Sequence, residues 1–193
     1  MSDGDVFGVF VYPDSDVSDV NRGLKVYHEN DVDVPPSKVD AAKGFENFDD
    51  AKFTAVRGDV GESIGYKALR EKYPDRDEYT ILNEIYLKGD GQTRAEIDLV
   101  VVDQDGEVVE MAEVKSVTGS SSTTQVGDAI EDAEDGFVDR TTSQRIEVED
   151  ITENADNIER TTIGPADDSG YDINTGLTEA EMNALTEAII ARN

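Results

Sequence analysis

The sequence predicts a single α/β domain, because helix-like and strand-like apolar patterns alternate along most of its length. Three observations support this fold class. Residues 61–73 place apolar side chains at helical spacing, residues 79–115 contain three strand-like runs, and the residues after 178 have the pattern of a capped helix. The chain has 193 residues, of which 37% are apolar, so it is long enough for one domain with a core of ordinary size.

The organisation along the chain predicts an N-terminal extension or small subdomain over residues 1–55 and the main domain over residues 56–193. Residues 6–12 form a short apolar run that predicts a strand, and a polar stretch containing Pro35 and Pro36 follows. We expect His28, the single histidine, to be an exposed side chain. No function follows from this extension.

Composition excludes several classes of protein. The chain lacks cysteine and has one histidine, which excludes disulfides, cysteine nucleophiles, thiolate metal sites and histidine-based zinc sites. No apolar run approaches the roughly 18 residues of a membrane span, and the N-terminus lacks the pattern of a secretory signal. We therefore expect a cytoplasmic protein with no membrane partner.

The charge is strongly acidic, with 45 acidic and 17 basic residues and a net charge of −28. The acids are spread over the chain instead of forming an acidic tail. This composition resembles that of haloarchaeal proteins or of proteins from their viruses, so we expect a protein adapted to high salt. At about 1 M salt the Debye length is about 3 Å, and the acidity therefore does not exclude a nucleic-acid substrate.

The first predicted helix has the sequence GESIGYKALREKY, starts at Gly61 and ends before Pro74. One face of it carries Glu62, Tyr66, Leu69 and Tyr73. Glu62 therefore lies on the side that should turn inward. A carboxylate is costly to bury there unless it meets a cation, a metal ion or hydrogen-bond donors.

Three strands follow, at residues 79–87, 95–102 and 107–115. The last two are rich in apolar residues at successive positions, which predicts central strands covered on both faces. Asp105-Gly106 is a favoured pair for a two-residue type I′ hairpin between them. In that register Gln104 faces Glu107.

Counting outward from this turn, Asp98 lies opposite Glu113, with about 5 Å between their Cβ atoms. Lys115 projects from the same face as Glu113. Like charges opposed across a sheet destabilise it, and a hard divalent cation with oxygen ligands would offset them. The alternative is a salt-bridged surface ladder in which Glu96 faces Lys115.

The rest of the chain predicts a loop at residues 119–123, a helix at about 124–133, strands at 145–151 and 161–163, and a loop at 166–176. Thr178 and Glu181 form a capping box for a last helix. Its apolar face consists of Met182, Leu185, Ala188 and Ile189. We expect this helix to serve packing.

Three segments, GESIGYKAL, AEIDLVVVD and AEVKS, occur in this order and resemble the PD-(D/E)XK nuclease superfamily. They are similar to the motifs of archaeal Holliday-junction resolvases and of related restriction-type and toxin-type nucleases. The resemblance covers about residues 60–150. It implies a restriction-endonuclease-like core of a helix, a three-stranded antiparallel meander, a helix and a further strand. One departure is Ile97, which stands where many members have a proline before the first acid.

The resemblance also implies roles for individual residues. Asp98 and Glu113 would bind Mg²⁺ or Mn²⁺, with the backbone carbonyl of Val114 as a further ligand. Lys115 would orient or help to deprotonate the attacking water and stabilise charge on the phosphate. Glu62 corresponds to a helical glutamate that helps to hold the metal ion.

Gln125 corresponds to a position where members keep a polar side chain near the site. The function expected is divalent-metal-dependent hydrolysis of phosphodiester bonds, with DNA favoured over RNA and with junction resolution, DNA processing, restriction and toxin roles open. A homodimer is expected because resolvases of this type act as dimers. The alternative is a catalytically inactive member of the fold that acts as a binding or virion-assembly protein in high salt.

Overall fold

The computed structural model describes residues 39, 42, 51–89, 92–119, 126, 127, 130, 136–139, 145–146, 151 and 155–192. The strand predicted at residues 6–12, His28 and Gln125 lie outside them.

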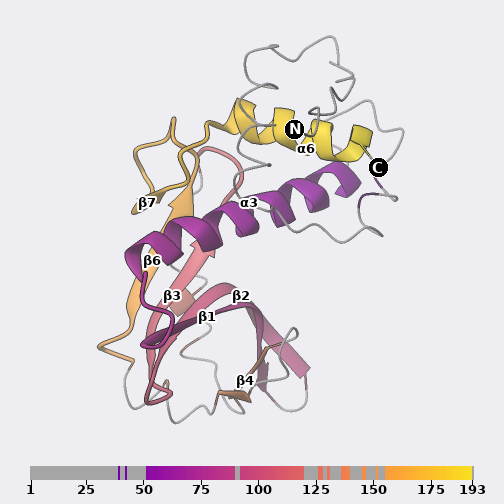
Figure 1. Ribbon diagram of the computed structural model, residues 1–193. Helices are drawn as coiled ribbons and strands as arrows, with labels where there is room; N and C mark the ends of the chain where they lie inside the picture. Colours follow the sequence, from indigo (N-terminus) through magenta and orange to yellow (C-terminus); the bar gives the residue numbers. More distant parts are fainter. Residues whose placement is uncertain are drawn as a thin grey trace, which may run out of the picture.

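The described elements form one mixed sheet and two long helices (Figure 1). In chain order they are α3 (Ala51–Lys72), β1 (Tyr79–Gly89), β2 (Gln92–Asp103), β3 (Val108–Val114), β4 (Gly136–Asp139), β5 (Arg145–Ile146), β6 (Glu159–Gly164), β7 (Ile173–Asn174) and α6 (Glu179–Arg192). The strand order in the sheet is β5-β4-β1-β2-β3-β6-β7.

The sheet topology confirms the predicted core. Strands β1, β2 and β3 pair antiparallel as a meander that follows α3, and β6 pairs parallel with β3. Residues 126, 127 and 130, between β3 and β6, are helical. This order of helix, meander, helix and further strand is that of a restriction-endonuclease-like fold, and the strands β4 and β5 extend it beyond β1.

The hairpin between β2 and β3 differs from the prediction at its turn. Asp103 N–H donates to the Glu107 carbonyl at 2.9 Å, and Gly106 has a φ of +89°, so the loop has three residues and ends in a left-handed glycine. The register then shifts between Val101 and Val102, because β3 has one extra residue, a β-bulge, at this point. This bulge cancels the longer loop, and Leu99 pairs with Ala112 as predicted.

Helix α3 begins at Ala51 instead of Gly61, and so crosses residue 55, where the sequence analysis divides the extension from the main domain. The added turns continue a buried stripe that includes Phe53 and Val56. This stripe packs with α6 and with Val39 and Ala42 in one apolar cluster. Nearer its C-terminal end, α3 packs against the sheet through Leu69.

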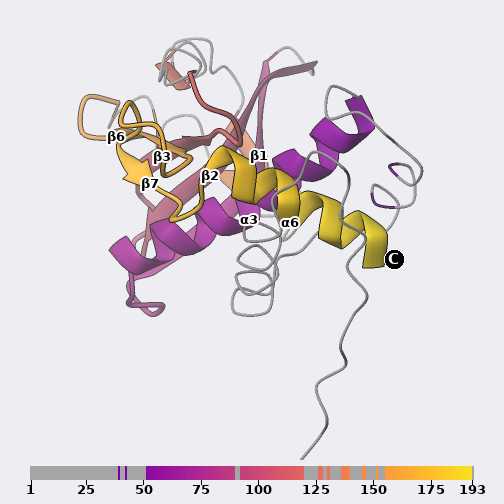
Figure 2. The same cartoon turned by 90° about the horizontal axis from the view of Figure 1, so that it is seen from above.

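Helix α6 lies alongside α3 in both views (Figures 1 and 2). The structure confirms its capping box. The Thr178 N–H donates to Glu181 Oε2 at 2.8 Å, and the Glu181 N–H donates to Thr178 Oγ1 at 3.2 Å. The predicted apolar face is buried, with Met182 and Leu185 fully inaccessible. This helix therefore serves packing, as the sequence predicts.

Strands β2 and β3 are covered on both faces. Leu69 of α3 packs with Leu99, Val101 and Ala112 on one face. On the other face, a second cluster consists of Leu82, Ile85, Ile97, Val100, Val108, Met111, Val126, Ile130, Ile151 and Ile158. The prediction of two central strands is confirmed, and the site residues on them lie against a packed core.

Three predicted elements in the C-terminal half differ from the structure. The strand expected at residues 145–151 is present as Arg145–Ile146, while Ile151 is helical. The predicted strand 161–163 extends to Glu159–Gly164. The predicted loop at 166–176 contains the two-residue strand Ile173–Asn174, which pairs parallel with the end of β6. A strand of two residues carries no periodic pattern to recognise.

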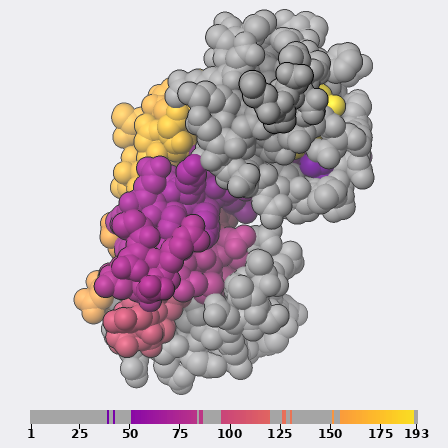
Figure 3. All heavy atoms as spheres, in the orientation of Figure 1, coloured from indigo at the N-terminus to yellow at the C-terminus, as the bar shows by residue number. Residues whose placement is uncertain are grey.

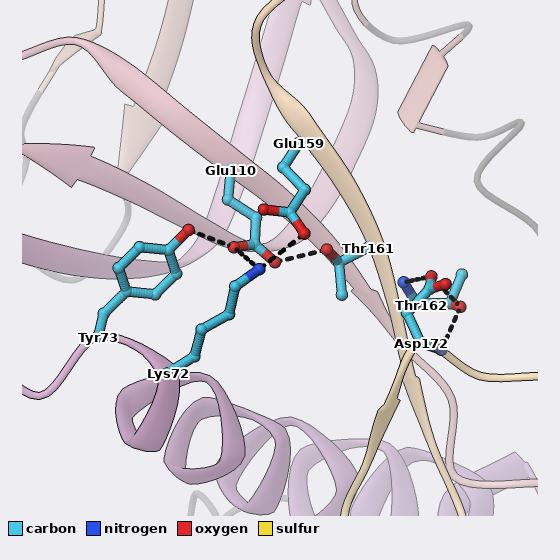
Figure 4. A network of polar contacts seen from close by, with 7 residues as sticks. All are labelled: Lys72, Tyr73, Glu110, Glu159, Thr161, Thr162 and Asp172. Atoms are coloured by element: carbon cyan, nitrogen blue, oxygen red, sulfur yellow. Dashed lines mark hydrogen bonds and ion pairs between the residues drawn. The ribbon is translucent and has the colours of Figure 1, made fainter.

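A buried carboxylate ties α3 to the sheet (Figure 4). Glu110 on β3 is inaccessible to solvent, and its Oε2 accepts from the Lys72 ammonium at 2.8 Å and the Tyr73 hydroxyl at 2.6 Å. Its Oε1 accepts from the Thr161 hydroxyl on β6. Burial and then the hydrogen bond to Glu110 raise the pKa of Tyr73 well above its usual value. Glu110 thus joins α3, β3 and β6.

Helix α3 is exposed along one side of the molecule, and the C-terminal part of the chain lies beside it (Figure 3). Among the described residues, no helix combines the length and the apolar composition needed to cross a membrane.

We predict that Tyr73→Phe lowers the free energy of unfolding by about 1.5–3 kcal/mol, because a buried carboxylate loses a hydrogen bond. The control is Tyr86→Phe, which removes an exposed hydroxyl that donates to Glu96 at 2.8 Å and should cost under about 1 kcal/mol. Guanidinium denaturation measures both. Equal losses in the two variants would contradict the role assigned to Glu110.

Candidate active site

The structure brings Asp98, in the middle of β2, together with Glu113 and Lys115 at the C-terminal end of β3. Asp98 lies on β2, one residue before the paired Leu99, and Glu113 lies on β3, one residue after its partner Ala112. Asp98 Oδ2 accepts a hydrogen bond of 2.7 Å from the Val114 backbone N–H. The acids thus face each other across β2 and β3 as the sequence predicts.

Glu113 is the more deeply buried acid, with 3% of its surface exposed. Its Oε1 pairs with the Lys115 ammonium, whose side chain is 25% exposed. Its Oε2 is buried and has no hydrogen-bond partner among the residues that the structure describes. A buried carboxylate oxygen in this condition is costly, so the site can accept a further donor or cation.

Asp98 has a pKa raised to about 7. Burial is the main cause, and the negative charge of Glu113 is the second. The hydrogen bond from the Val114 N–H and the charge of Lys115 lower the pKa but do not compensate, and Glu96 raises it slightly further. The two acids therefore repel each other where solvent access is limited, and the charge of one lysine does not fully offset this repulsion.

These donors fit a hard divalent cation. Carboxylate oxygens are the ligands that Mg²⁺ and Mn²⁺ prefer, and the buried Oε2 of Glu113 lies beside an acid that resists ionisation. Within the described residues, no three or more histidine, cysteine, aspartate or glutamate side chains are arranged to hold a metal ion. The observed candidate is thus a site with two acids.

Glu62 lies on the part of α3 that packs beside the C-terminal end of β3, and among the described residues it does not join such a cluster. It is half-buried on α3, directly after Gly61. A Cβ added at Gly61 would lie 3.2 Å from the Ser116 Cβ, and one added at Gly65 would lie 2.9 Å from Val114 Cγ2, so α3 touches the chain next to the site. Ligation of a metal ion by Glu62 stays a prediction.

The alternative of a surface salt ladder fits only in part. Glu96 is exposed, as that reading expects, and accepts a hydrogen bond from the Tyr86 hydroxyl at 2.8 Å. Glu113, however, is buried, and Lys115 pairs with it. An exposed ladder does not explain a carboxylate that is 3% exposed.

Sequence reasoning missed the residues that hold the segment after Lys115. Asp168, Tyr171 and Glu179 contact residues 117–119 from a distant part of the sequence. The contact of Glu179 was not predicted, because an acid in the first turn of a helix next to a capping box is already explained by helix capping. No local signal in Asp168 or Tyr171 indicates this contact.

A comparison with models of protein families identifies the family of this chain. The model of the nuclease-related domain (NERD) family matches residues 57–161, which is more than half of the 193-residue chain. The matched range contains α3 from residue 57 on, the meander, Asp98, Glu113 and Lys115. A search of curated proteins and a search of solved structures each found no significant match.

We predict that Asp98→Asn stabilises the metal-free protein at pH 8. A raised pKa means that the fold favours the protonated acid, so this stability is full below the unfolded-state pKa of about 4 and is lost as pH rises through about 7. Asparagine removes that loss, and we expect a gain of about 1–3 kcal/mol at pH 8 that becomes smaller at pH 5.

Guanidinium denaturation in EDTA at both pH values measures this difference. Asp105→Asn is the matched control, because it removes the same charge from the exposed hairpin loop. A wild-type protein as stable as Asp98→Asn at pH 8 would show that the two acids do not repel each other in a buried site.

Proposed function

Because this chain belongs to the nuclease-related domain family, we propose that it is a divalent-metal-dependent endonuclease that hydrolyses phosphodiester bonds, DNA in preference to RNA. The observation that carries the proposal is the pair of the half-buried Asp98 and the buried Glu113, with Lys115 beside it. An acid pair and a lysine on adjacent central strands are the parts that such a reaction needs.

Asp98 and Glu113 are the residues proposed to hold Mg²⁺ or Mn²⁺, together with the backbone carbonyl of Val114. Such an ion, when bound, acidifies water and neutralises charge that develops on the phosphate. The orphaned Oε2 of Glu113 and the raised pKa of Asp98 support this assignment. Glu62 is proposed as an additional ligand from α3, and Gln125 as a polar residue near the site.

Lys115 is proposed to act on the water and on the phosphate. Its ammonium pairs with Glu113, which keeps the positive charge next to the acids while the side chain stays partly exposed. An ammonium in this place can orient a water by hydrogen bonding and stabilise negative charge on a phosphate oxygen. It needs no histidine, and His28 lies in the N-terminal part of the chain.

The net charge of −28 bears on how such a protein meets a polyanion. At low salt its surface would repel nucleic acid. At about 1 M salt the repulsion reaches only about 3 Å, and counterion release contributes little affinity. We therefore propose that substrate binding depends on the metal ion and on close contacts, and that activity is highest in concentrated salt.

A second candidate function is that of an inactive family member that binds a partner or takes part in virion assembly. The observation in its favour is that no three acids among the described residues are arranged around a metal ion. In that case the pairing of Lys115 with Glu113 would be structural only. The assay below separates the two functions.

We predict that the wild-type protein cleaves plasmid or junction DNA in molar KCl with Mg²⁺ or Mn²⁺, and that Lys115→Ala lowers the rate by about 10²–10³. RNA is assayed in parallel, and cleavage of each substrate is followed on gels with EDTA as the blank. Lys52→Ala, at the exposed start of α3, is the matched control and should keep the wild-type rate. Equal cleavage by wild type and Lys115→Ala would favour the inactive scaffold.

We also predict that Asp98→Asn and Glu113→Gln each weaken Mn²⁺ binding at least tenfold in titration calorimetry, because each removes a charged oxygen ligand. The control is Glu107→Gln, which neutralises an exposed acid beside the hairpin turn. Glu62→Gln, measured in the same series, tests the predicted third acid. Identical heats for wild type and the first two variants would exclude the proposed metal site.

A further inference from the structure

The segment that follows Lys115 is held by side chains from a distant part of the chain. The Tyr171 hydroxyl donates to the Val117 carbonyl at 2.6 Å. Glu179 Oε2 accepts from the backbone N–H of Thr118 at 2.8 Å and from its hydroxyl at 2.7 Å. Three long-range contacts thus begin two residues after the site lysine, the third being made by Asp168.

Asp168 completes the set of contacts. Its Oδ2 accepts from the Gly119 N–H at 2.7 Å, and its Oδ1 accepts from the Gly170 N–H at 2.8 Å. These two donors lower the pKa of Asp168. Gly119 has a φ of +87°, a conformation that glycine adopts readily. The contacts therefore cover Val117, Thr118 and Gly119 in sequence.

The holding segment, residues 165–179, is itself braced against the sheet. The ring of Tyr171 lies so close to Gly164 that a Cβ added at Gly164 would fall 2.3 Å from it. Asp172 Oδ2 accepts from the Thr162 N–H at 2.8 Å and from its hydroxyl at 2.9 Å. Residues 165–179 are thus fixed to the end of β6.

Strand β6 links this segment to the acids. Thr162 pairs with Glu113 in the parallel ladder, and the Lys115 N–H donates to the Ile163 carbonyl at 2.8 Å. The backbone of Lys115 is therefore hydrogen-bonded to β6, and the residues that follow it, 117–119, are hydrogen-bonded to residues 165–179.

We propose that residues 165–179, through Asp168, Tyr171 and Glu179, are a positioning element that sets where the ammonium of Lys115 lies in the active site. This inference rests on the nuclease function proposed above. Residues 165–179 lie outside the matched range 57–161, so this chain supplies the element from its own C-terminal part.

The contacts serve the site more than the stability of the fold. Residues 118 and 119 are exposed, and Asp168 lies near the surface, where hydrogen bonds contribute little to stability. The neighbouring core depends instead on apolar packing of α3 against α6. Losing one contact should therefore leave the protein folded and shift the chain after Lys115.

The contrary reading is that the carboxylates of Asp168 and Glu179 block the site. They occupy the backbone N–H groups of Thr118 and Gly119, three and four residues after Lys115, and such groups are also able to bind a phosphate. If so, removing them would raise activity. The positioning role requires the opposite change.

The test uses full-length Tyr171→Phe and Asp168→Ala, with Asp75→Ala as the matched control. Asp75 also accepts from two backbone N–H groups, at 2.9 and 3.3 Å, but in the exposed loop after α3. We expect kcat to fall about tenfold or more in the first two variants, with KM changed less than twofold, because a misplaced group costs rate more than binding. Asp168→Asn, which keeps one acceptor oxygen, should recover part of the rate.

A second readout does not need activity. Relaxation of the labelled Lys115 side-chain carbons, measured by NMR in the metal-free protein, should show a lower order parameter in Tyr171→Phe and Asp168→Ala than in wild type or Asp75→Ala. Guanidinium denaturation checks that each variant is folded. If Tyr171→Phe does not fold, Asp168→Ala alone provides the test.

Unchanged kcat and unchanged relaxation in both variants would overturn the positioning role, and so would a rise in kcat. A wild-type protein without nuclease activity would refute the proposed function. The relaxation data would then decide the inference alone: a more mobile Lys115 supports positioning, and an unaltered one excludes it.

Discussion

The candidate site depends on the repulsion between two carboxylates, one half-buried and one buried, that lie side by side on adjacent central strands. Asp98 and Glu113 meet because β2 and β3 lie in the middle of the sheet, with apolar clusters on both faces. The Val114 N–H and the Lys115 ammonium compensate part of the cost, yet the pKa of Asp98 rises to about 7 and one oxygen of Glu113 stays without a hydrogen bond. A divalent cation would supply the missing charge.

Glu110, a second buried acid on β3, has hydrogen-bond partners for both of its carboxylate oxygens. Glu110 and Glu113 lie three positions apart on the strand, an odd offset, so they point to opposite faces of the sheet. Glu110 receives a lysine, a tyrosine hydroxyl and a threonine hydroxyl and ties α3 to the sheet. Glu113 receives one lysine. The difference in partners distinguishes a structural carboxylate from one that can bind a ligand.

The sequence predicted the parts of the fold that local patterns specify. The capping box of Thr178 and Glu181, the apolar strands and the opposition of Asp98 and Glu113 needed only short-range rules. The turn prediction was wrong because the three-residue loop and the bulge in β3 offset each other, which no local pattern reveals. The early start of α3 and the contacts of Asp168 and Tyr171 arise from tertiary packing. Such contacts join residues about 50 positions apart, as in the hydrogen bond from Tyr171 to Val117.

Anomalous diffraction from crystals grown with Mn²⁺ tests the central claim most directly, because it locates the ion without relying on activity. The account predicts an anomalous peak within bonding distance of Oε2 of Glu113 and of the Asp98 carboxylate, together with loss of that peak in Asp98→Asn. A wild-type crystal at saturating Mn²⁺ with peaks only elsewhere on the acidic surface would contradict it.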